Sequence, residues 1–110
     1  MGTPESMHSP LDAFCALIVE DMRIMPTHIS MYVALWHAWQ QNGSEGPVLL
    51  DKAALMRAAK ISARQTYHDA LRGLHAFGYI RYEPSADPRI KSRVWLTASG
   101  TAAHPVIKMK

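Results

Sequence analysis

The segment from residue 60 to residue 97 constrains the fold most, because a helical pattern changes abruptly into a strand pattern within it. Apolar residues recur at helical spacing up to Phe77, and Gly78 then provides a natural helix stop. Two alternating runs follow, over residues 79–83 and 93–97, and the loop between them contains two prolines. The sequence therefore predicts a helix that leads directly into a two-stranded hairpin with a long loop.

Two helices are expected before this segment. Ser9 precedes a proline, which is typical of a helix start, and apolar residues continue at helical spacing over residues 11–25 until Pro26. This predicted helix is apolar on more than one face, so either a partner subunit or its own domain should cover it. Thr27 can cap a second helix that ends near Asn42.

The next elements are short. Residues 48–50 form an apolar run typical of a strand, and Asp51 can cap a brief helix through Ala59. Ser62 can cap the following helix over residues 62–77, since Gln65 three positions later completes a capping-box pattern.

Burial can also be predicted from the spacing of apolar residues. Cys15 lies among apolar residues and is expected in the core, and as the single cysteine it cannot form an internal disulfide. The second helix carries one apolar stripe that should face the core. Its members are Ile29, Tyr32, Val33, Trp36 and Trp39.

The chain reads as one domain over residues 11–97, between a flexible N-terminus (residues 1–10) and a tail (residues 98–110). No apolar run is long enough to cross a membrane, and the first residues lack the pattern of a signal peptide. A cytoplasmic protein without membrane partners is the expectation.

The net charge is +3, but its distribution is uneven. Residues 1–51 carry six acidic residues and one basic residue, whereas residues 52–110 carry eleven basic and three acidic residues. The C-terminal half is therefore the side expected to meet a polyanion.

Enzyme activity is not expected, because the chain lacks a phosphate-binding glycine loop, a zinc-protease motif, paired cysteines and a nucleophile elbow. His68 and His75 share a helical face but stand about 10 Å apart along the axis, too far to bind one metal ion. No catalytic residue, metal or cofactor is predicted.

The stretch ISARQTYHDALRGLHAFGYIRYE, followed by SRVWLT, resembles the winged helix-turn-helix superfamily of bacterial DNA-binding proteins. The resemblance covers about residues 27–97. It implies a mainly α fold with a small β-hairpin (α+β), preceded here by an extra N-terminal helix. Residues 51–59 would be the positioning helix, 62–77 the recognition helix and 84–92 the wing.

The resemblance implies binding of double-stranded DNA, with the recognition helix in the major groove and the wing on the backbone or in the minor groove. The expected contact residues lie on the exposed face of that helix, at its start and in the wing. They are Lys60, Ser62, Arg64, Gln65, Thr66, His68, Arg72, Arg89, Lys91 and Arg93. Asp69 would repel phosphate unless it pairs with Arg72.

Other functions remain open at this point. A bacterial transcriptional regulator is the first expectation, and an accessory factor in replication or in recombination of mobile DNA is an alternative. A winged helix can also serve as a protein-interaction module, since fold does not fix function. A homodimer through the helix over residues 11–25 would present two recognition helices to one palindromic site. Neither the target sequence nor an effector ligand can be predicted.

Overall fold

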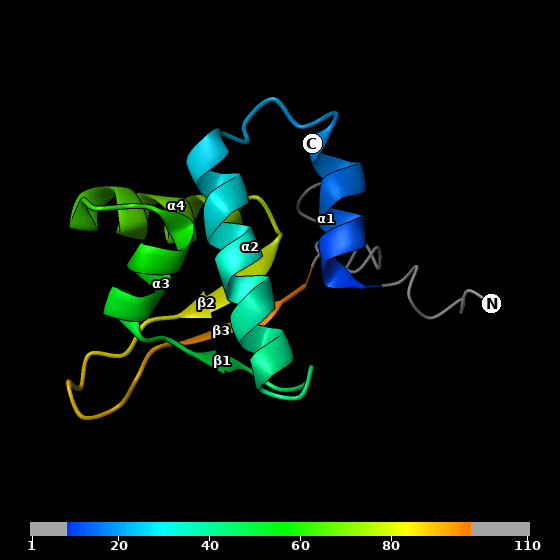
Figure 1. Ribbon diagram of the computed structural model, residues 1–110. Helices are drawn as coiled ribbons and strands as arrows, with labels where there is room; N and C mark the ends of the chain where they lie inside the picture. The colour runs from blue at the N-terminus through cyan, green and yellow to red at the C-terminus, as the bar shows by residue number, and fades with distance from the viewer. Residues whose placement is uncertain (1–8, 98–110) are drawn as a thin grey trace.

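The computed structural model describes residues 9–97 of the 110-residue chain. Within that range the chain forms four helices and a three-stranded antiparallel sheet (Figure 1). In chain order the elements are α1 (Pro10–Ile18), α2 (Pro26–Gln41), β1 (Val48–Leu49), α3 (Lys52–Ala59), α4 (Arg64–Ala76), β2 (Ile80–Glu83) and β3 (Arg93–Leu96). The predicted α+β class with a C-terminal hairpin is confirmed. The expectations for residues 1–8 and for the tail 98–110 lie outside the described part.

The sheet has the order β1-β3-β2, so the predicted hairpin gains a third strand at one edge. Ile80 pairs with Leu96 and Tyr82 with Val94, while Val48 of β1 pairs with Val94 from the other side. Because side chains alternate along a strand, these residues share one face, and that face packs into the core. The hairpin therefore contributes to the core as well as carrying a loop.

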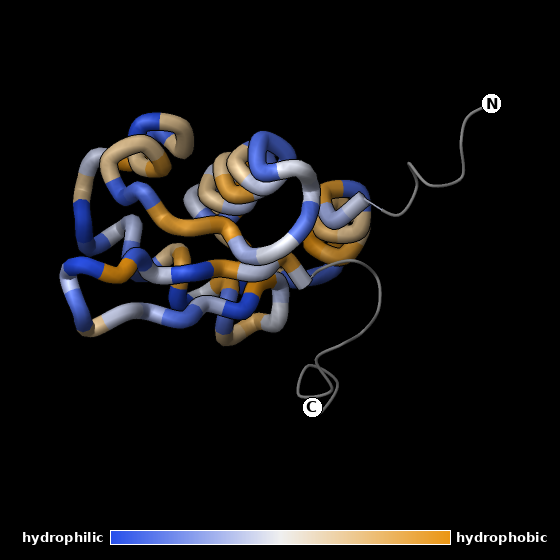
Figure 2. Tube along the Cα trace, turned by 90° about the horizontal axis from the view of Figure 1, so that it is seen from below, coloured by the Kyte–Doolittle hydropathy of each residue, from blue (hydrophilic) through white to orange (hydrophobic). Residues whose placement is uncertain are grey.

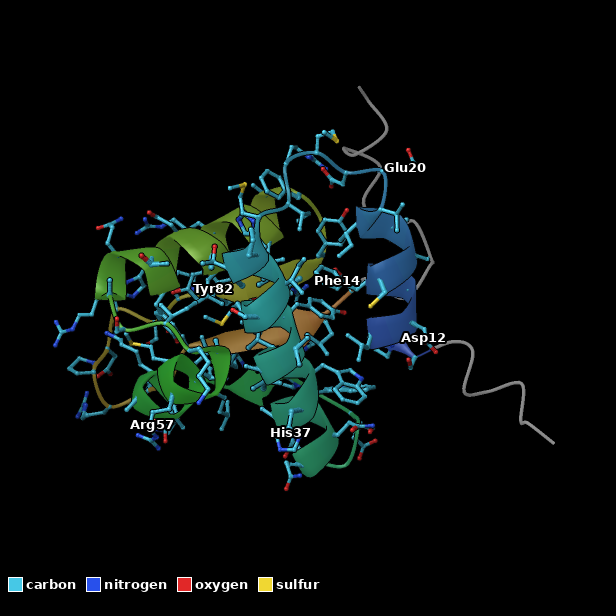
Figure 3. All side chains as sticks on the ribbon, turned by 45° about the horizontal axis from the view of Figure 1, so that its top comes forward. Asp12, Phe14, Glu20, His37, Arg57 and Tyr82 are labelled. Atoms are coloured by element: carbon cyan, nitrogen blue, oxygen red, sulfur yellow. The ribbon has the colours of Figure 1, made fainter. Side chains whose placement is uncertain are left out.

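Helix α2 is the central element, and it packs against α1, α3, α4 and β1 (Figure 1). Phe14 joins α1 to this core, because its ring stacks on that of Tyr32 with 3.9 Å between centroids. Figure 3 shows Phe14 between the two helices. The Tyr32 hydroxyl also donates a hydrogen bond to the carbonyl of Pro10, at 3.3 Å.

Several predicted boundaries are confirmed. The Ser9 hydroxyl accepts a hydrogen bond from the Asp12 amide at 3.1 Å, so it caps α1 as expected. Pro10 is already the first residue of that helix and is buried, so the flexible N-terminal segment expected over residues 1–10 does not extend to it. Asp51 caps α3 through the Ala54 amide at 3.1 Å, and Gly78, at φ +91°, follows the end of α4.

The prediction of one helix over residues 11–25 is wrong, because α1 ends at Ile18. The carboxylate of Asp21 accepts the backbone amide of Arg23 at 3.0 Å, so that amide does not bond to a helical carbonyl. The same carboxylate binds the Arg23 side chain at 2.7 and 2.8 Å and the Tyr79 hydroxyl at 2.6 Å. This network holds the α1–α2 connection against the start of the hairpin.

The predicted details of α2 also need correction. The helix begins at Pro26 rather than after Thr27, because proline fits the first helical position. Its fully buried residues include Met31 and Leu35, whereas Ile29 and Val33 of the expected stripe are 39% and 42% exposed. The buried face is displaced because α2 contacts α1 on one side and the rest of the domain on another.

Cys15 is exposed, contrary to the expectation of a core position. Its neighbour Phe14 points into the core. Because consecutive helical residues point about 100° apart, the Cys15 side chain then points away from the core. No helix among residues 9–97 is long and apolar enough to cross a membrane.

Candidate nucleic-acid interface

The turn between α3 and α4 differs from the prediction. Lys60 ends α3 with a left-handed backbone (φ +62°), and the Ile61 amide then donates to the Met56 carbonyl at 2.9 Å. Because Ile61 buries its side chain in the core, the chain stays extended through Ala63, and α4 begins only at Arg64. The predicted Ser62 cap and capping box are therefore wrong, and the exposed Ser62 lies in the turn.

Helix α4 separates its buried and exposed residues as the sequence predicts. Tyr67, Leu71 and Leu74 are buried in the core, whereas Arg64 and Arg72 are exposed. The helix is strongly amphipathic, so its position fixes which side chains a partner can reach. Five predicted contact residues share this exposed or half-exposed surface. They are Arg64, Gln65, Thr66, His68 and Arg72.

Hydrogen bonds organise that surface. The Gln65 amide donates to Asp69 Oδ1 at 2.8 Å, and Arg72 Nη1 lies 3.8 Å from the same oxygen. The expected Asp69–Arg72 pair is thus present, although both side chains are more than 60% exposed. His68 Nδ1 lies 3.0 Å from the Arg64 carbonyl, which can only accept, so Nδ1 carries the hydrogen.

The loop over residues 84–92 is closed at its base. The Ser85 amide donates to the Ser92 hydroxyl oxygen at 3.0 Å, and the Ser85 hydroxyl donates to the Asp87 carbonyl at 3.1 Å. Arg89 forms two side-chain hydrogen bonds to the Asp87 carboxylate, which hold the pKa of that carboxyl below its usual value. Lys91, at the other end of the loop, is exposed.

Arg93 lies on the outer face of the sheet, with Glu83, Arg81 and Trp95. Its Nη2 donates to Glu83 Oε1 at 2.9 Å, and its guanidinium carbon is 5.3 Å from the Trp95 ring centroid. Arg81 lies over the same ring at 4.1 Å and pairs with Glu83 at 3.5 Å. Cross-strand contacts of this kind stabilise a hairpin, and they turn Arg93 away from the face that Tyr82 shares with the core.

Ion pairing divides the basic residues into two groups. Three predicted contacts have a carboxylate partner, namely Arg72, Arg89 and Arg93. Other basic side chains have no ion pair within residues 9–97, and they are Lys52, Arg57, Lys60, Arg64 and Lys91. Lys52 and Arg57 were not among the predicted contacts. In the sequence, their positive charge was the only indication that they could contact a polyanion. Which elements lie beside α3 depends on the tertiary structure.

A pocket of about 380 Å³ lies where α4, the first turn of α3 and the base of the 84–92 loop meet. Its lining includes Lys52 from α3, His68 and Arg72 from α4, and Tyr82 from β2. Figure 3 shows Tyr82 beside α4, and in Figure 2 the loop end of the hairpin carries mainly hydrophilic colours. The structure thus brings predicted residues of α4 together with Lys52 and Tyr82, which the sequence analysis did not single out.

Two acidic residues, at α1 and just after it, lie far from the basic end of α3. Figure 3 shows Asp12 and Glu20 at the α1 end and Arg57 at the α3 end. The unpaired cations around the α3–α4 turn therefore lie apart from those acids. Within residues 9–97, no group of three or more His, Cys, Asp and Glu side chains has an arrangement that could hold a metal ion.

Comparison with protein-family models, with curated proteins and with solved structures gave no match to this chain.

Proposed function

We propose that this chain is a winged helix-turn-helix protein that binds double-stranded DNA, with α4 in the major groove and the 84–92 loop on the adjacent backbone. The observation that carries the proposal is the grouping of unpaired cations along α3, its turn into α4, and the loop. Lys60 and Arg64 flank the turn, Lys52 begins α3, and Lys91 lies in the loop. Cations without internal partners are available to replace the counterions of a duplex.

The paired arginines also fit this proposal. Arg72 and Asp69 are 67% and 61% exposed, and a surface pair of this kind contributes roughly 0–1 kcal/mol. Arg72 can therefore exchange the Asp69 carboxylate for a DNA phosphate with little loss of free energy. Gln65 is held by Asp69 in the free protein, and release of this amide would let it reach a base edge.

Transcriptional regulation is our first candidate among DNA-binding roles. Its support is the mixture of amide, hydroxyl and guanidinium groups on the first turns of α4, which suits base-edge recognition. An accessory role in replication or in recombination of mobile DNA uses the same interface. Selection of bound sequences from a random duplex library separates specific from general binding, because only specific binding enriches one motif.

The direct test is fluorescence anisotropy of a labelled duplex over a salt series, with Arg64→Gln compared with Arg81→Gln. Both variants lose one positive charge from a partly exposed arginine, but Arg81 lies on the outer face of the sheet. We expect Arg64→Gln to weaken binding and to reduce the salt slope by about 1. Arg81→Gln should leave the slope nearly unchanged.

Equal effects of the two variants would mean that only total charge matters, and would contradict the proposed interface. Absence of binding by the wild-type protein at low salt would favour the alternative of a protein-interaction module.

We also propose a homodimer through α1 and the segment that follows it. Large apolar side chains remain exposed there, including Val19 at 73%, Met22 at 90% and Met25 at 56%. Exposed apolar side chains gathered in one region are typical of protein contacts. Sedimentation of Met22→Ser beside the wild type tests this, and a wild-type monomer at high concentration, both free and on DNA, would exclude it.

A further inference from the structure

The pocket between α3, α4 and the 84–92 loop is lined by a buried tyrosine whose hydroxyl has no hydrogen-bond partner among the described residues. Tyr67 is only 2% exposed and lines this pocket. The other two deeply buried tyrosines donate hydrogen bonds, Tyr32 to the Pro10 carbonyl and Tyr79 to Asp21. Within residues 9–97, the Tyr67 hydroxyl makes none. Burial raises the pKa of Tyr67 to about 12, so this hydroxyl stays protonated and can donate.

The Tyr67 hydroxyl is unpartnered but not sealed inside the protein. Among the described residues, the only fully buried side-chain nitrogen or oxygen without a hydrogen bond is Nε1 of Trp36. The Tyr67 oxygen therefore keeps contact with the pocket space. A hydroxyl in that position can donate a hydrogen bond to a group that enters the pocket.

The pocket lining is rich in donors and free of carboxylates. Lys52 supplies an unpaired ammonium group and Arg72 a weakly paired guanidinium. The Ser92 oxygen accepts from the Ser85 amide, which leaves the Ser92 hydroxyl hydrogen available. Two acids lie near the pocket but outside its lining: Asp51 caps α3, and Asp69 accepts from Gln65 and pairs weakly with Arg72.

Several donors and two cations around one small space match an anion with several oxygen acceptors. A phosphate has this chemistry, because its oxygens accept charge-assisted hydrogen bonds from lysine, arginine and hydroxyl groups together. Carboxylates line none of the pocket, so a bound metal cation or an amine would lack its usual ligands.

We propose that this pocket seats a phosphate of the DNA backbone, with Tyr67 and Lys52 as its main donors and Arg72 beside them. The inference rests on the proposed function and deepens it. A phosphate held here touches the recognition helix, the start of α3 and the loop at the same time. It would therefore fix the register of α4 in the groove without reading the sequence.

The test is Tyr67→Phe, with Tyr32→Phe as the matched control that also removes one buried hydroxyl. Because the Tyr67 hydroxyl has no hydrogen-bond partner among residues 9–97, Tyr67→Phe should unfold at the wild-type temperature or slightly above it. We expect its affinity for duplex DNA to fall about ten-fold, the effect of one hydrogen bond to a charged group. Lys52→Gln should lower both the affinity and the salt slope, while Tyr32→Phe should bind as the wild type does.

A second measurement distinguishes the source of the phosphate. Amide chemical shifts of the wild-type protein are followed during titration with inorganic phosphate and, separately, with a deoxynucleoside monophosphate. Weak binding in the millimolar range, centred on the pocket and lost in Tyr67→Phe, supports a backbone phosphate. Micromolar binding of the nucleotide, with unchanged DNA affinity in Tyr67→Phe, would instead make the pocket a nucleotide site and overturn the proposal.

Failure of the pocket and failure of the proposed function give different results. If Arg64→Gln weakens DNA binding but Tyr67→Phe and Lys52→Gln do not, the chain binds DNA and the pocket assignment is wrong. If the wild type binds no duplex, the proposed function fails, and the inference that depends on it fails as well.

Discussion

Replacement of Gly73 by alanine should destabilise the domain, although alanine is the better helix former. Gly73 lies in α4 where α2 crosses it, and a Cβ added there would be 2.5 Å from Nε2 and 3.1 Å from Cδ2 of His28. The imidazole cannot turn away freely, because its Nδ1 accepts the Met25 amide at 2.8 Å and its ring meets Phe77 edge-on. Overpacking costs about 1–3 kcal/mol, against a helix-propensity gain of about 1 kcal/mol. The expected net loss is about 1 kcal/mol.

A double-mutant cycle with His28→Ala isolates this contact. Without the imidazole, the new methyl group has room, so Gly73→Ala should stabilise the His28→Ala protein by about 1 kcal/mol. The coupling energy is then about 2 kcal/mol, measured as the free energy of unfolding in urea by circular dichroism. At this chain size each kcal/mol corresponds to a shift of about 4–8 °C in Tm. Equal destabilisation in both backgrounds would refute the close approach of α2 and α4 at Gly73.

The network around Asp21 gives two further predictions. Asp21→Asn should lower the free energy of unfolding by about 1–3 kcal/mol, because it weakens the charged hydrogen bonds from Arg23 and Tyr79. Tyr79→Phe removes one of these bonds, so it should lower the free energy of unfolding by less in the same urea titration. The hydrogen bonds from Arg23 hold the pKa of Asp21 well below its usual value, and burial lowers the pKa of His28. Both groups thus contribute stability above their unfolded pKa values and lose it as pH falls. Urea midpoints should decline below about pH 6.5 and again below about pH 4, with the first step absent in His28→Gln. Finally, Lys60→Gly should raise Tm, because glycine adopts the positive φ of this residue without strain, but it should weaken DNA binding. Lys60→Gln should weaken DNA binding without raising Tm. Equal Tm values for the two variants would exclude backbone strain at Lys60.

Local signals in the sequence located most of the secondary structure. Ser9 and Asp51 cap the helices that they were predicted to cap, α2 ends near Asn42, and Gly78 follows α4. The alternation over the hairpin gave both of its strands. These features depend on a few neighbouring residues, since a cap or a turn glycine acts within about one helical turn.

The errors occurred where distant residues decide the outcome. The apolar spacing through residue 25 was consistent with a helix, but Asp21 bonds to Tyr79, which is 58 residues further along the chain. Ser62 had the sequence pattern of a cap, but burial of Ile61 keeps the chain extended at that point. Propensity and spacing cannot anticipate such contacts, because tertiary packing overrides them.

In the candidate site too, local features could be predicted and tertiary contacts could not. The sequence identified the basic half of the chain from its composition, and the exposed face of α4 from the helical spacing of its apolar residues. It could not show that Glu83 holds Arg93, because the register of the hairpin decides which carboxylate meets this arginine. It also gave Tyr67 an ordinary core position, and among the described residues the missing hydrogen bond distinguishes it from the other two buried tyrosines, Tyr32 and Tyr79.

The Asp21 network connects the two proposed contact surfaces. Met22 and Met25 lie in the α1–α2 connection that we propose as a dimer contact, and Arg23 between them stacks on Phe77 at 4.3 Å, at the C-terminal end of α4. The α1–α2 connection therefore contacts the C-terminal end of the helix that we propose to enter the groove. A dimer formed through Met22 and Met25 would hold both copies of α4 at a fixed separation. If Asp21→Asn loosens this connection, it should weaken binding to a two-site duplex more than binding to a single site.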